Sequence, residues 1–417
     1  MSRWVRLVAA VVAMIQIANL QYAWTLFVQP LRDAHGWSLS DVQWGLTVFI
    51  ALETWAMPPG GLMIERFSKR MMITVAGLMC AVGWAGLGFV TTLPGLYFSY
   101  AVAGIGAAIV YCGSIGVALK WFPDRRGLAA GIIAAGFGSG SALFTPFLPG
   151  LIASWGYQMT FVATGLFQGM LIVASAHFIS GEGAVAPVVA VPKAAQARRV
   201  FRKQMQDFTP GEMLRTMQFY WLYAMMLMMG IGGLLATAQV APVGKSFGIP
   251  AEFITLSVTV NAIANGSGRF FWGMVSDRLG RELTMVIAFL IQSASLVGVM
   301  VLGPTSGVMF VTMMALVFFT WGEVYSLFPS VLADFYGGNN AGGKYGFLYS
   351  TKGVASIVAA GLAAKLFEST GTWAPAFYGS AALALVSTGM AVGLMKLPLP
   401  SKKDLPATSG AAVGAQS

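Results

Sequence analysis

The sequence predicts an all-α, polytopic membrane protein with twelve transmembrane helices in two pseudo-symmetric six-helix bundles, and three observations predict this class. Of the 417 residues, 57% are hydrophobic and only 10% are charged, whereas soluble domains carry about 25% charged residues. The apolar residues form long unbroken runs, which are typical of spanning helices and not of the alternating strands of a membrane β-barrel. The two halves of the chain also repeat one another at a fixed offset.

Twelve apolar segments are long enough to cross a bilayer, which takes about 20 residues of helix. We expect the spans at residues 4–30, 40–63, 71–92, 95–119, 127–149, 157–180, 217–243, 251–275, 283–302, 306–332, 343–367 and 373–396. The first segment follows a basic N-terminus. It is interpreted as a span and not as a signal peptide, because the apolar run is too long and no small-residue cleavage site follows it.

The charges predict both the domain organisation and the orientation in the membrane. We expect an N-terminal bundle over 1–180, a cytoplasmic linker over 181–216, a C-terminal bundle over 217–396 and a cytoplasmic tail over 397–417. Of the 25 Lys and Arg residues, 20 fall on the side of the termini, and three on the other side: Arg32, Lys245 and Lys365. This excess predicts a multi-pass protein of the cell (inner) membrane with both termini in the cytoplasm. It also explains the net charge of +10 without a nucleic-acid partner.

An internal repeat relates the two halves with an offset of 212 residues. The matched pairs are Pro30 and Pro242, Gly36 and Gly248, Gly61 and Gly273, Glu65 and Asp277, and Arg66 and Arg278. Parallel six-helix repeats are typical of transporters, in which the substrate site lies between the halves near the bilayer midplane.

Several function classes are disfavoured by the motifs. Two cysteines and two separated histidines offer no cluster with metal-ligand spacing. The sequence has no Walker motif and no nucleophile–base pair. We therefore expect no metal, no cofactor and no enzymatic activity. The expected partners are a small substrate and the lipid bilayer, with the chain acting as a monomer.

Two basic residues, Arg269 and Lys352, lie within predicted spans away from the membrane edges. A charge at that depth costs about 2.5–3.5 kcal/mol or more, so it normally faces a cavity and has a function or a partner. The planar guanidinium of an Arg can donate two parallel hydrogen bonds to a carboxylate, and the ammonium of a Lys provides a point charge. The pair predicts a site for a small carboxylate anion. The alternative is that each cation pairs with an intramembrane acid and only holds helices together.

Two acids, Glu53 and Glu323, lie in the second and tenth predicted spans. Two unpaired cations would make reorientation of an empty carrier costly, which favours strict exchange. Nearby Glu residues could neutralise the empty site, and protonation of one would release a cation for the substrate. We therefore consider proton coupling through these two acids. The alternative is that they are hydrogen-bonded packing residues.

The loops that contain Gly61-Leu-Met-Ile-Glu65-Arg66 and Gly273-Met-Val-Ser-Asp277-Arg278 resemble the G-x-x-x-D-R signature of the major facilitator superfamily. The resemblance implies the twelve-helix fold of that superfamily. A carboxylate and an Arg in a short turn can bridge helix ends across the boundary between the halves. We expect a conformational latch made of Glu65, Arg66, Asp277 and Arg278.

A finer resemblance, to the oxalate/formate antiporter branch, covers nearly the whole chain. It rests on segments such as Gln21–Leu26, Trp121–Ala129, Gly211–Thr216, Arg269–Gly273 and Thr320–Gly322. The resemblance implies that Arg269 and Lys352 bind substrate. It further implies pocket residues Gln21, Tyr22, Tyr111, Trp321 and Tyr325. Glu53 and Glu323 stand where that branch has neutral residues.

We therefore expect a secondary active transporter of small carboxylates that works by alternating access, of the oxalate/formate antiport type. The first alternative is a proton-coupled, lactate-like monocarboxylate symporter. A passive anion channel is disfavoured by the repeat and the duplicated motif. A non-transporting sensor is disfavoured by the short polar tail.

Overall fold

The structure, a computed structural model, describes residues 2–144, 146–179, 206–359 and 363–402, and every regular element in these ranges is helical. The N-terminal half contains α1 (Arg3–Tyr22), α2 (Trp24–His35), α3 (Leu39–Trp55), α4 (Met57–Arg66), α5 (Lys69–Gly86), α6 (Leu93–Trp121), α7 (Arg126–Ser139), η1 (Gly140–Leu143) and α8 (Leu148–Ile179). The chain continues through α10 (Pro210–Met213), α11 (Met217–Ser246), α12 (Ala251–Leu279), α13 (Arg281–Val301), η2 (Gly303–Thr305), α14 (Gly307–Trp321), α15 (Val324–Tyr336), α16 (Ala341–Tyr349), α17 (Thr351–Ile357), α18 (Ala363–Thr370) and α19 (Ala374–Lys396).

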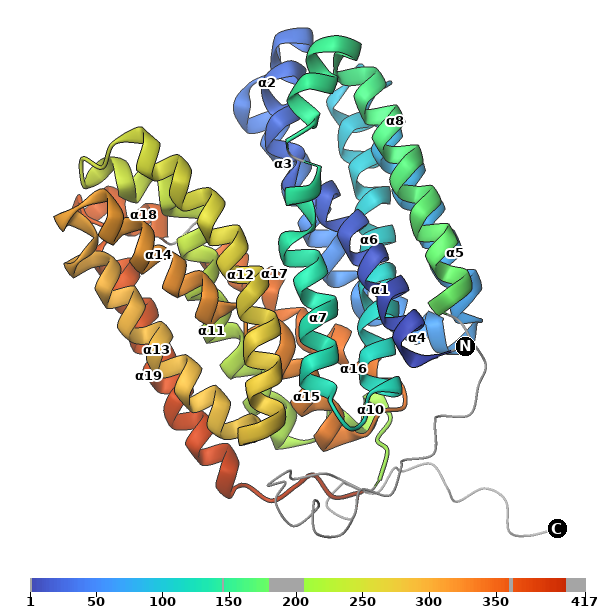
Figure 1. Cartoon of the computed structure of the whole chain (residues 1–417), viewed down its shortest axis with the longest axis vertical. Coiled ribbons are helices and arrows are strands. Elements are labelled where there is room, and N and C mark those ends of the chain that lie inside the picture. Colours follow the sequence, from blue (N-terminus) through green and yellow to red (C-terminus); the bar gives the residue numbers. More distant parts are fainter. Residues whose placement is uncertain (1, 145, 180–205, 360–362, 403–417) are drawn as a thin grey trace.

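The helices form two bundles, one built from α1 to α8 and the other from α11 to α19 (Figure 1). The bundles lean together at one end and splay apart at the other. The predicted all-α fold with two six-helix bundles is confirmed. Residues 180–205 of the predicted bundle end and linker, and residues 403–417 of the predicted tail, lie outside the described part of the chain.

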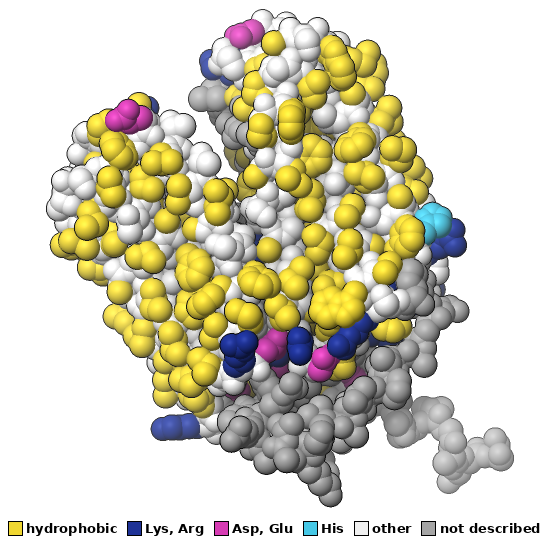
Figure 2. All heavy atoms as spheres, in the orientation of Figure 1, with side chains coloured by type: hydrophobic (Ala, Val, Ile, Leu, Met, Phe, Trp, Pro, Cys, Tyr) yellow, Lys and Arg dark blue, Asp and Glu magenta, His cyan; other side chains and the backbone are white. Residues whose placement is uncertain are grey.

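Seven helical stretches of the described chain are long and apolar enough to cross a membrane. They correspond to predicted spans 1, 4, 6, 7, 9, 10 and 12. Spans 2, 3, 5, 8 and 11 correspond to α3–α4, α5, α7–η1 with the part of α8 before its kink at Gly156, α12 and α16–α18, which are shorter, interrupted or more charged. Apolar side chains cover the flanks, and most charged side chains on the visible face gather near its two ends (Figure 2). This distribution is that of a multi-pass membrane protein.

Four spans contain a turn part-way along their length that separates two α-helices, which the apolar runs did not predict. The interruptions lie at Ala23 between α1 and α2, Ala56 between α3 and α4, Gly322 before α15, and Ser350 between α16 and α17. A Cβ on Gly322 would lie 2.6 Å from the Asn265 carbonyl oxygen, so this position requires close approach to α12. The turns are mild, because all four residues keep right-handed helical dihedrals and still donate to the carbonyl oxygen four residues earlier.

The repeat is visible in the backbone and in the packing. Gly36 and Gly248 end the first span of each half with positive φ values of 67° and 71°, a region that favours glycine. Gly61 on α4 packs against α16, and Gly273 on α12 packs against α7. The two halves therefore present equivalent glycines to each other.

The halves are closed together on what we call the terminus side, the end of the molecule at which α1 begins and α19 ends (Figure 1). Here α7 packs against α12 and α15, and α16 packs against α4 and α6. A charge cluster, defined as Arg126, Asp277, Arg281 and Asp334, joins them. Arg126 Nη1 lies 2.6 Å from Asp334 Oδ1, and Arg281 bridges Asp334 at 3.0 Å and Asp277 at 2.6 Å.

Asp277 also accepts hydrogen bonds from two backbone N–H groups at the start of α7. The distances are 3.1 Å from Gly127 N to Oδ1 and 2.8 Å from Leu128 N to Oδ2. A carboxylate at a helix N-terminus is favoured by the helix dipole and by the unpaired N–H groups there. Because α7 and α12 belong to different halves, this contact holds the terminus side shut.

The opposite end, which we call the open side, shows a notch between the two halves (Figure 2). The structure is thus a conformation that is closed on the terminus side and open on the other. Alternating access requires this state and a second one, in which the two halves are open on the terminus side and closed on the other.

We predict that Gly273→Val opens the terminus side. A Cβ at Gly273 would lie 2.2 Å from the Gly127 carbonyl oxygen, so α7 and α12 must separate. Spin labels on the exposed Arg66 and Arg278 positions, one in each half, should show a longer distance by double electron–electron resonance.

Gly389→Val on α19 is the matched control, since a Cβ there meets no atom within 4 Å. An unchanged distance distribution in the Gly273 variant would contradict the packing described here.

Candidate functional site

A cavity of about 180 Å³ lies between the two halves, at the level of the helix interruptions. It extends along α11 from Leu234 to Val240, and α11 runs from the terminus side to the open side, so the cavity reaches toward the open side. Its polar and aromatic lining comes from both halves: Gln21, Tyr22, Phe137, Ser141, Thr237, Asn261, Asn265, Arg269, Phe318, Trp321, Tyr325, Tyr349 and Lys352. Both intramembrane cations therefore line one cavity.

Arg269 is held by neutral groups only. Its side chain is buried on α12, where Nε donates to Asn265 Oδ1 at 3.0 Å. Nη1 donates to the Ala134 carbonyl oxygen of α7 at 2.9 Å. The guanidinium carbon lies 4.2 Å from the ring centroid of Tyr325, a cation–π distance. No carboxylate of the described residues forms an ion pair with Arg269, so its positive charge is uncompensated in the cavity.

Lys352 is held by an acid of the other half. Its Nζ donates to Glu53 Oε2 at 2.9 Å and to the Tyr349 hydroxyl at 3.0 Å. Both members of the ion pair are buried, with 7% of the Lys352 side chain and 0% of the Glu53 side chain exposed. The second oxygen of Glu53, Oε1, has no hydrogen-bond partner among the described residues. The pair thus joins α17 to α3 across the boundary between the halves.

The predicted aromatic residues occupy two layers. Tyr22, Trp321 and Tyr325 line the cavity, as does Gln21. Tyr111 is not in the lining. Its ring packs behind the wall, with centroid distances of 4.9 Å to Tyr349 and 5.3 Å to Phe137.

Sequence reasoning missed seven polar or aromatic lining residues. Asn265 and Tyr349 hold the two cations, and both carried a usable signal, because Asn265 precedes Arg269 by four residues on α12 and Tyr349 precedes Lys352 by three residues across the turn from α16 to α17. The other five line the cavity but carried no signal of that kind in the sequence: Phe137, Ser141, Thr237, Asn261 and Phe318.

Glu323 lies at the junction of α14 and α15 and is fully buried. It is not part of the cavity lining, and neither of its carboxyl oxygens has a hydrogen-bond partner within the described chain. Of the two acids considered for proton coupling, the structure therefore places only Glu53 in contact with a cation of the cavity.

Of the four expected latch residues, the structure brings Asp277 into contact across the halves. Arg66 and Arg278 are exposed, and the side chain of Glu65 lies outside the described part. The other members of the charge cluster (Arg126, Arg281 and Asp334) were missed. Arg126 and Arg281 were counted only as loop charges, and the sequence offered no pattern that pairs them with Asp334.

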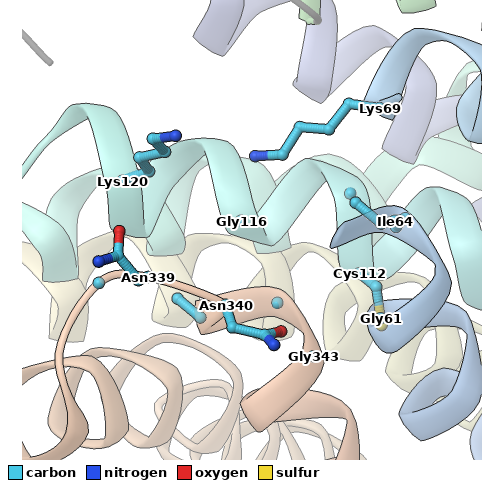
Figure 3. Close-up of a pocket in the computed structure, with 13 residues that line it drawn as sticks. Gly61, Ile64, Lys69, Cys112, Gly116, Lys120, Asn339, Asn340 and Gly343 are labelled. Atoms are coloured by element: carbon cyan, nitrogen blue, oxygen red, sulfur yellow. The ribbon is translucent and has the colours of Figure 1, made fainter. Parts of the chain in front are cut away.

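A second and larger cavity, of about 290 Å³, lies on the terminus side, between α4, α6 and the turn before α16. Figure 3 shows the side chains of Lys69 and Lys120 directed toward the space between them, near Asn339 and Gly343. Neither Arg269 nor Lys352 lines it. The smaller central cavity, which holds both intramembrane cations, is therefore the candidate substrate site.

Comparison with known proteins agrees with the class of protein that the fold and the central site define. The family model described as Major Facilitator Superfamily matches residues 9–342 and again 220–416. The chain therefore belongs to this superfamily of membrane transporters. The Oxalate:formate antiporter of Oxalobacter formigenes is 36% identical over 403 residues, which cover 96% of this chain and 94% of that protein.

Two further proteins are more distant. Apicoplast pyruvate carrier 1 of Toxoplasma gondii is 23% identical, over 80% of this chain and 71% of that protein. The crystal structure of the human organic anion transporter MFSD10 superposes with a TM-score of 0.70 at 15% identity, and covers 93% of this chain and 99% of that one. This last similarity concerns the fold alone.

We predict that Glu53→Gln and Lys352→Met each destabilise the protein by about 3–5 kcal/mol, because each leaves a buried charge without its partner. The double variant should recover most of the loss, since no unpaired charge remains. Thermal unfolding of the purified variants in detergent measures this coupling. Losses that simply add in the double variant would mean that the contact between Lys352 and Glu53 carries no stability.

Proposed function

We propose that the protein is a secondary active transporter that exchanges small carboxylate anions, of the oxalate/formate type, by alternating access. One observation carries this proposal. Arg269 is a buried cation without a carboxylate partner among the described residues, and it faces a cavity between the halves that a second cation also lines. Such a residue is by default functional. The 36% identity to an oxalate:formate antiporter supports the same substrate class.

The geometry suggests a role for each cation. The guanidinium of Arg269, oriented by Asn265 and by the ring of Tyr325, offers a planar fork to one carboxylate group. Lys352 offers a point charge, which a substrate carboxylate reaches by competing with Glu53. The rings of Tyr22 and Trp321 narrow the cavity, which favours small planar anions.

Both cations also contact the N-terminal half, Arg269 through Ala134 and Lys352 through Glu53. A substrate that binds both would therefore bridge the halves and draw the open side together. Release on the terminus side then requires the charge cluster of Arg126, Asp277, Arg281 and Asp334 to separate. Asp277 acts as the latch residue in this scheme.

We further propose that the terminus side faces the cytoplasm of the cell (inner) membrane, because the basic loop residues lie there. The chain acts as a monomer and as a carrier rather than an enzyme. In support, one chain supplies both cations, their contacts to the other half and the charge cluster.

A second candidate function is proton-coupled symport of a monocarboxylate, and the ion pair between Lys352 and Glu53 favours it. A proton on Glu53 would release Lys352 for substrate. Glu323 has no hydrogen bond or ion pair to either cation, so its proposed part in coupling has less support.

Uptake into proteoliposomes separates these functions. Labelled C1–C4 carboxylates are tested with and without unlabelled carboxylate inside, and with and without a pH gradient. Exchange predicts uptake that is stimulated by internal carboxylate. Uptake driven by a proton gradient into empty vesicles would identify the symporter, and no carboxylate uptake under any condition would contradict the proposal.

We predict that Arg269→Lys lowers the rate of labelled oxalate uptake by about 10–100-fold. The change removes one arm of a charge-assisted bidentate contact, and a hydrogen bond to a charged group contributes about 1.5–3 kcal/mol. Lys352→Arg should retain more activity, since a point charge is replaced by another cation. Wild-type rates in both variants would argue against a binding role.

A further inference from the structure

The charges that meet in the central cavity can be counted. Arg269 contributes one positive charge with only neutral partners, whereas Lys352 and Glu53 cancel each other. Among the described residues, Glu53 is the one carboxyl in contact with either cation. Glu53 is not itself a lining residue, but it contacts the lining residue Lys352. The two cations and Glu53 thus carry a net charge of +1 when Glu53 is ionised and of +2 when Glu53 is protonated.

We propose that the protonation state of Glu53 adjusts the net charge of the site to the charge of the bound substrate. With Glu53 ionised the loaded site accepts a monocarboxylate, and with Glu53 protonated it accepts a dicarboxylate dianion. Exchange of a dianion for a monoanion then moves one proton with the dianion and no net charge across the membrane. This inference rests on the proposed carboxylate exchange and adds its stoichiometry.

Charge balance supports this assignment. A monoanion with ionised Glu53 and the two cations sums to zero, and so does a dianion with protonated Glu53. A dianion beside ionised Glu53 would leave a buried net charge of −1 and place carboxylates against each other, which a low-dielectric site disfavours. The empty site keeps a charge of +1, so its reorientation is disfavoured and exchange is retained.

The overall step balances. One dianion and one proton move in one direction, with a summed charge of −1, and one monoanion of charge −1 moves in the other. The proton is taken up by the Glu53 carboxyl on the side where the dianion binds. It is released on the other side when Lys352 pairs again with Glu53.

The two carboxyl oxygens of Glu53 have different surroundings. Oε2 is held by Lys352, while the buried Oε1 has no partner among the described residues and is free to take the proton. The neighbouring helices present the following titratable groups to it: Lys352 from α17, Tyr349 from α16, Tyr100, Tyr111 and Cys112 from α6, Tyr22 from α1 and Tyr325 from α15.

The other charged groups near α3 lie farther away. Arg269 of α12 lines the cavity without contacting Glu53, while the charged residues of α2 and α4 lie at the ends of those helices away from Glu53. Lys352 is therefore the one charged side chain in direct contact with Glu53 in the described chain. Occupation of Lys352 by a substrate carboxylate changes the state of Glu53 directly.

The test uses proteoliposomes of the full-length protein loaded with formate and a trapped pH indicator. Uptake of labelled oxalate is measured while potassium and valinomycin impose a membrane potential of either sign. We expect an accumulation ratio that does not respond to the potential, and one proton entering with each oxalate. One uncompensated charge would instead change the ratio about 50-fold per 100 mV.

Two variants refine the test. Glu53→Gln fixes the cavity at +2, so oxalate uptake should become sensitive to the potential and should no longer carry a proton. Formate–formate exchange should fall in the same variant. Glu323→Gln, a matched change of a buried Glu that contacts neither cation, should keep oxalate uptake insensitive to the potential.

The outcomes are distinguishable. Oxalate–formate exchange by the wild type that responds to the potential and moves no proton overturns this inference and leaves the proposed function intact. The absence of any exchange overturns both. The wild-type measurement decides the matter even if Glu53→Gln fails to fold.

Discussion

The arrangement of the two halves depends on the free-energy cost of burying the charges of Arg269 and Lys352 at membrane depth. A buried charge in a spanning helix is tolerated when it is solvated by partners or faces a cavity, and here the two cations meet that condition in different ways. Arg269 is surrounded by an amide, a backbone carbonyl and an aromatic ring. Lys352 is neutralised by Glu53. In both cases one of the partners belongs to the other half of the molecule.

The helix interruptions follow from the same constraint. Tyr22, Glu53, Trp321 and Tyr349 lie at or next to the ends of α1, α3, α14 and α16, where these spans are broken. Tyr22, Trp321 and Tyr349 line the cavity, and Glu53 contacts the lining residue Lys352. The cavity therefore lies at the level of these turns, while uninterrupted helices such as α6 and α19 surround it.

Glycines on the terminus side show how the two halves close. Gly61 against Gly343, and Gly273 against Gly127, bring backbones into contact without side chains between them. The charge cluster then adds a set of contacts that can be made or broken as a unit. Close packing and a separable cluster together suit an interface that must open during each transport cycle.

The sequence predicted the fold well because its signals are local. Spans follow from apolar runs, and the repeat follows from pairs such as Gly36 and Gly248, whose positive φ values the structure shows. The two cations could be found because charge within an apolar run is conspicuous. The sequence also showed Glu53 as a candidate acid, but not that it pairs with Lys352, since the two residues lie 299 positions apart. Asp334 and Arg126 were missed for the same reason.

The central claim is that the cavity between the halves binds small carboxylates through Arg269. The most direct measurement is thermal unfolding of the purified wild-type protein in detergent with increasing oxalate or formate, and with chloride at equal ionic strength. A ligand that binds only the folded state stabilises it by about 2.7 kcal/mol at a concentration one hundred times its Kd. We predict a saturable rise in Tm with the carboxylates and none with chloride. An equal rise with chloride, or no rise with any small carboxylate, would contradict the claim.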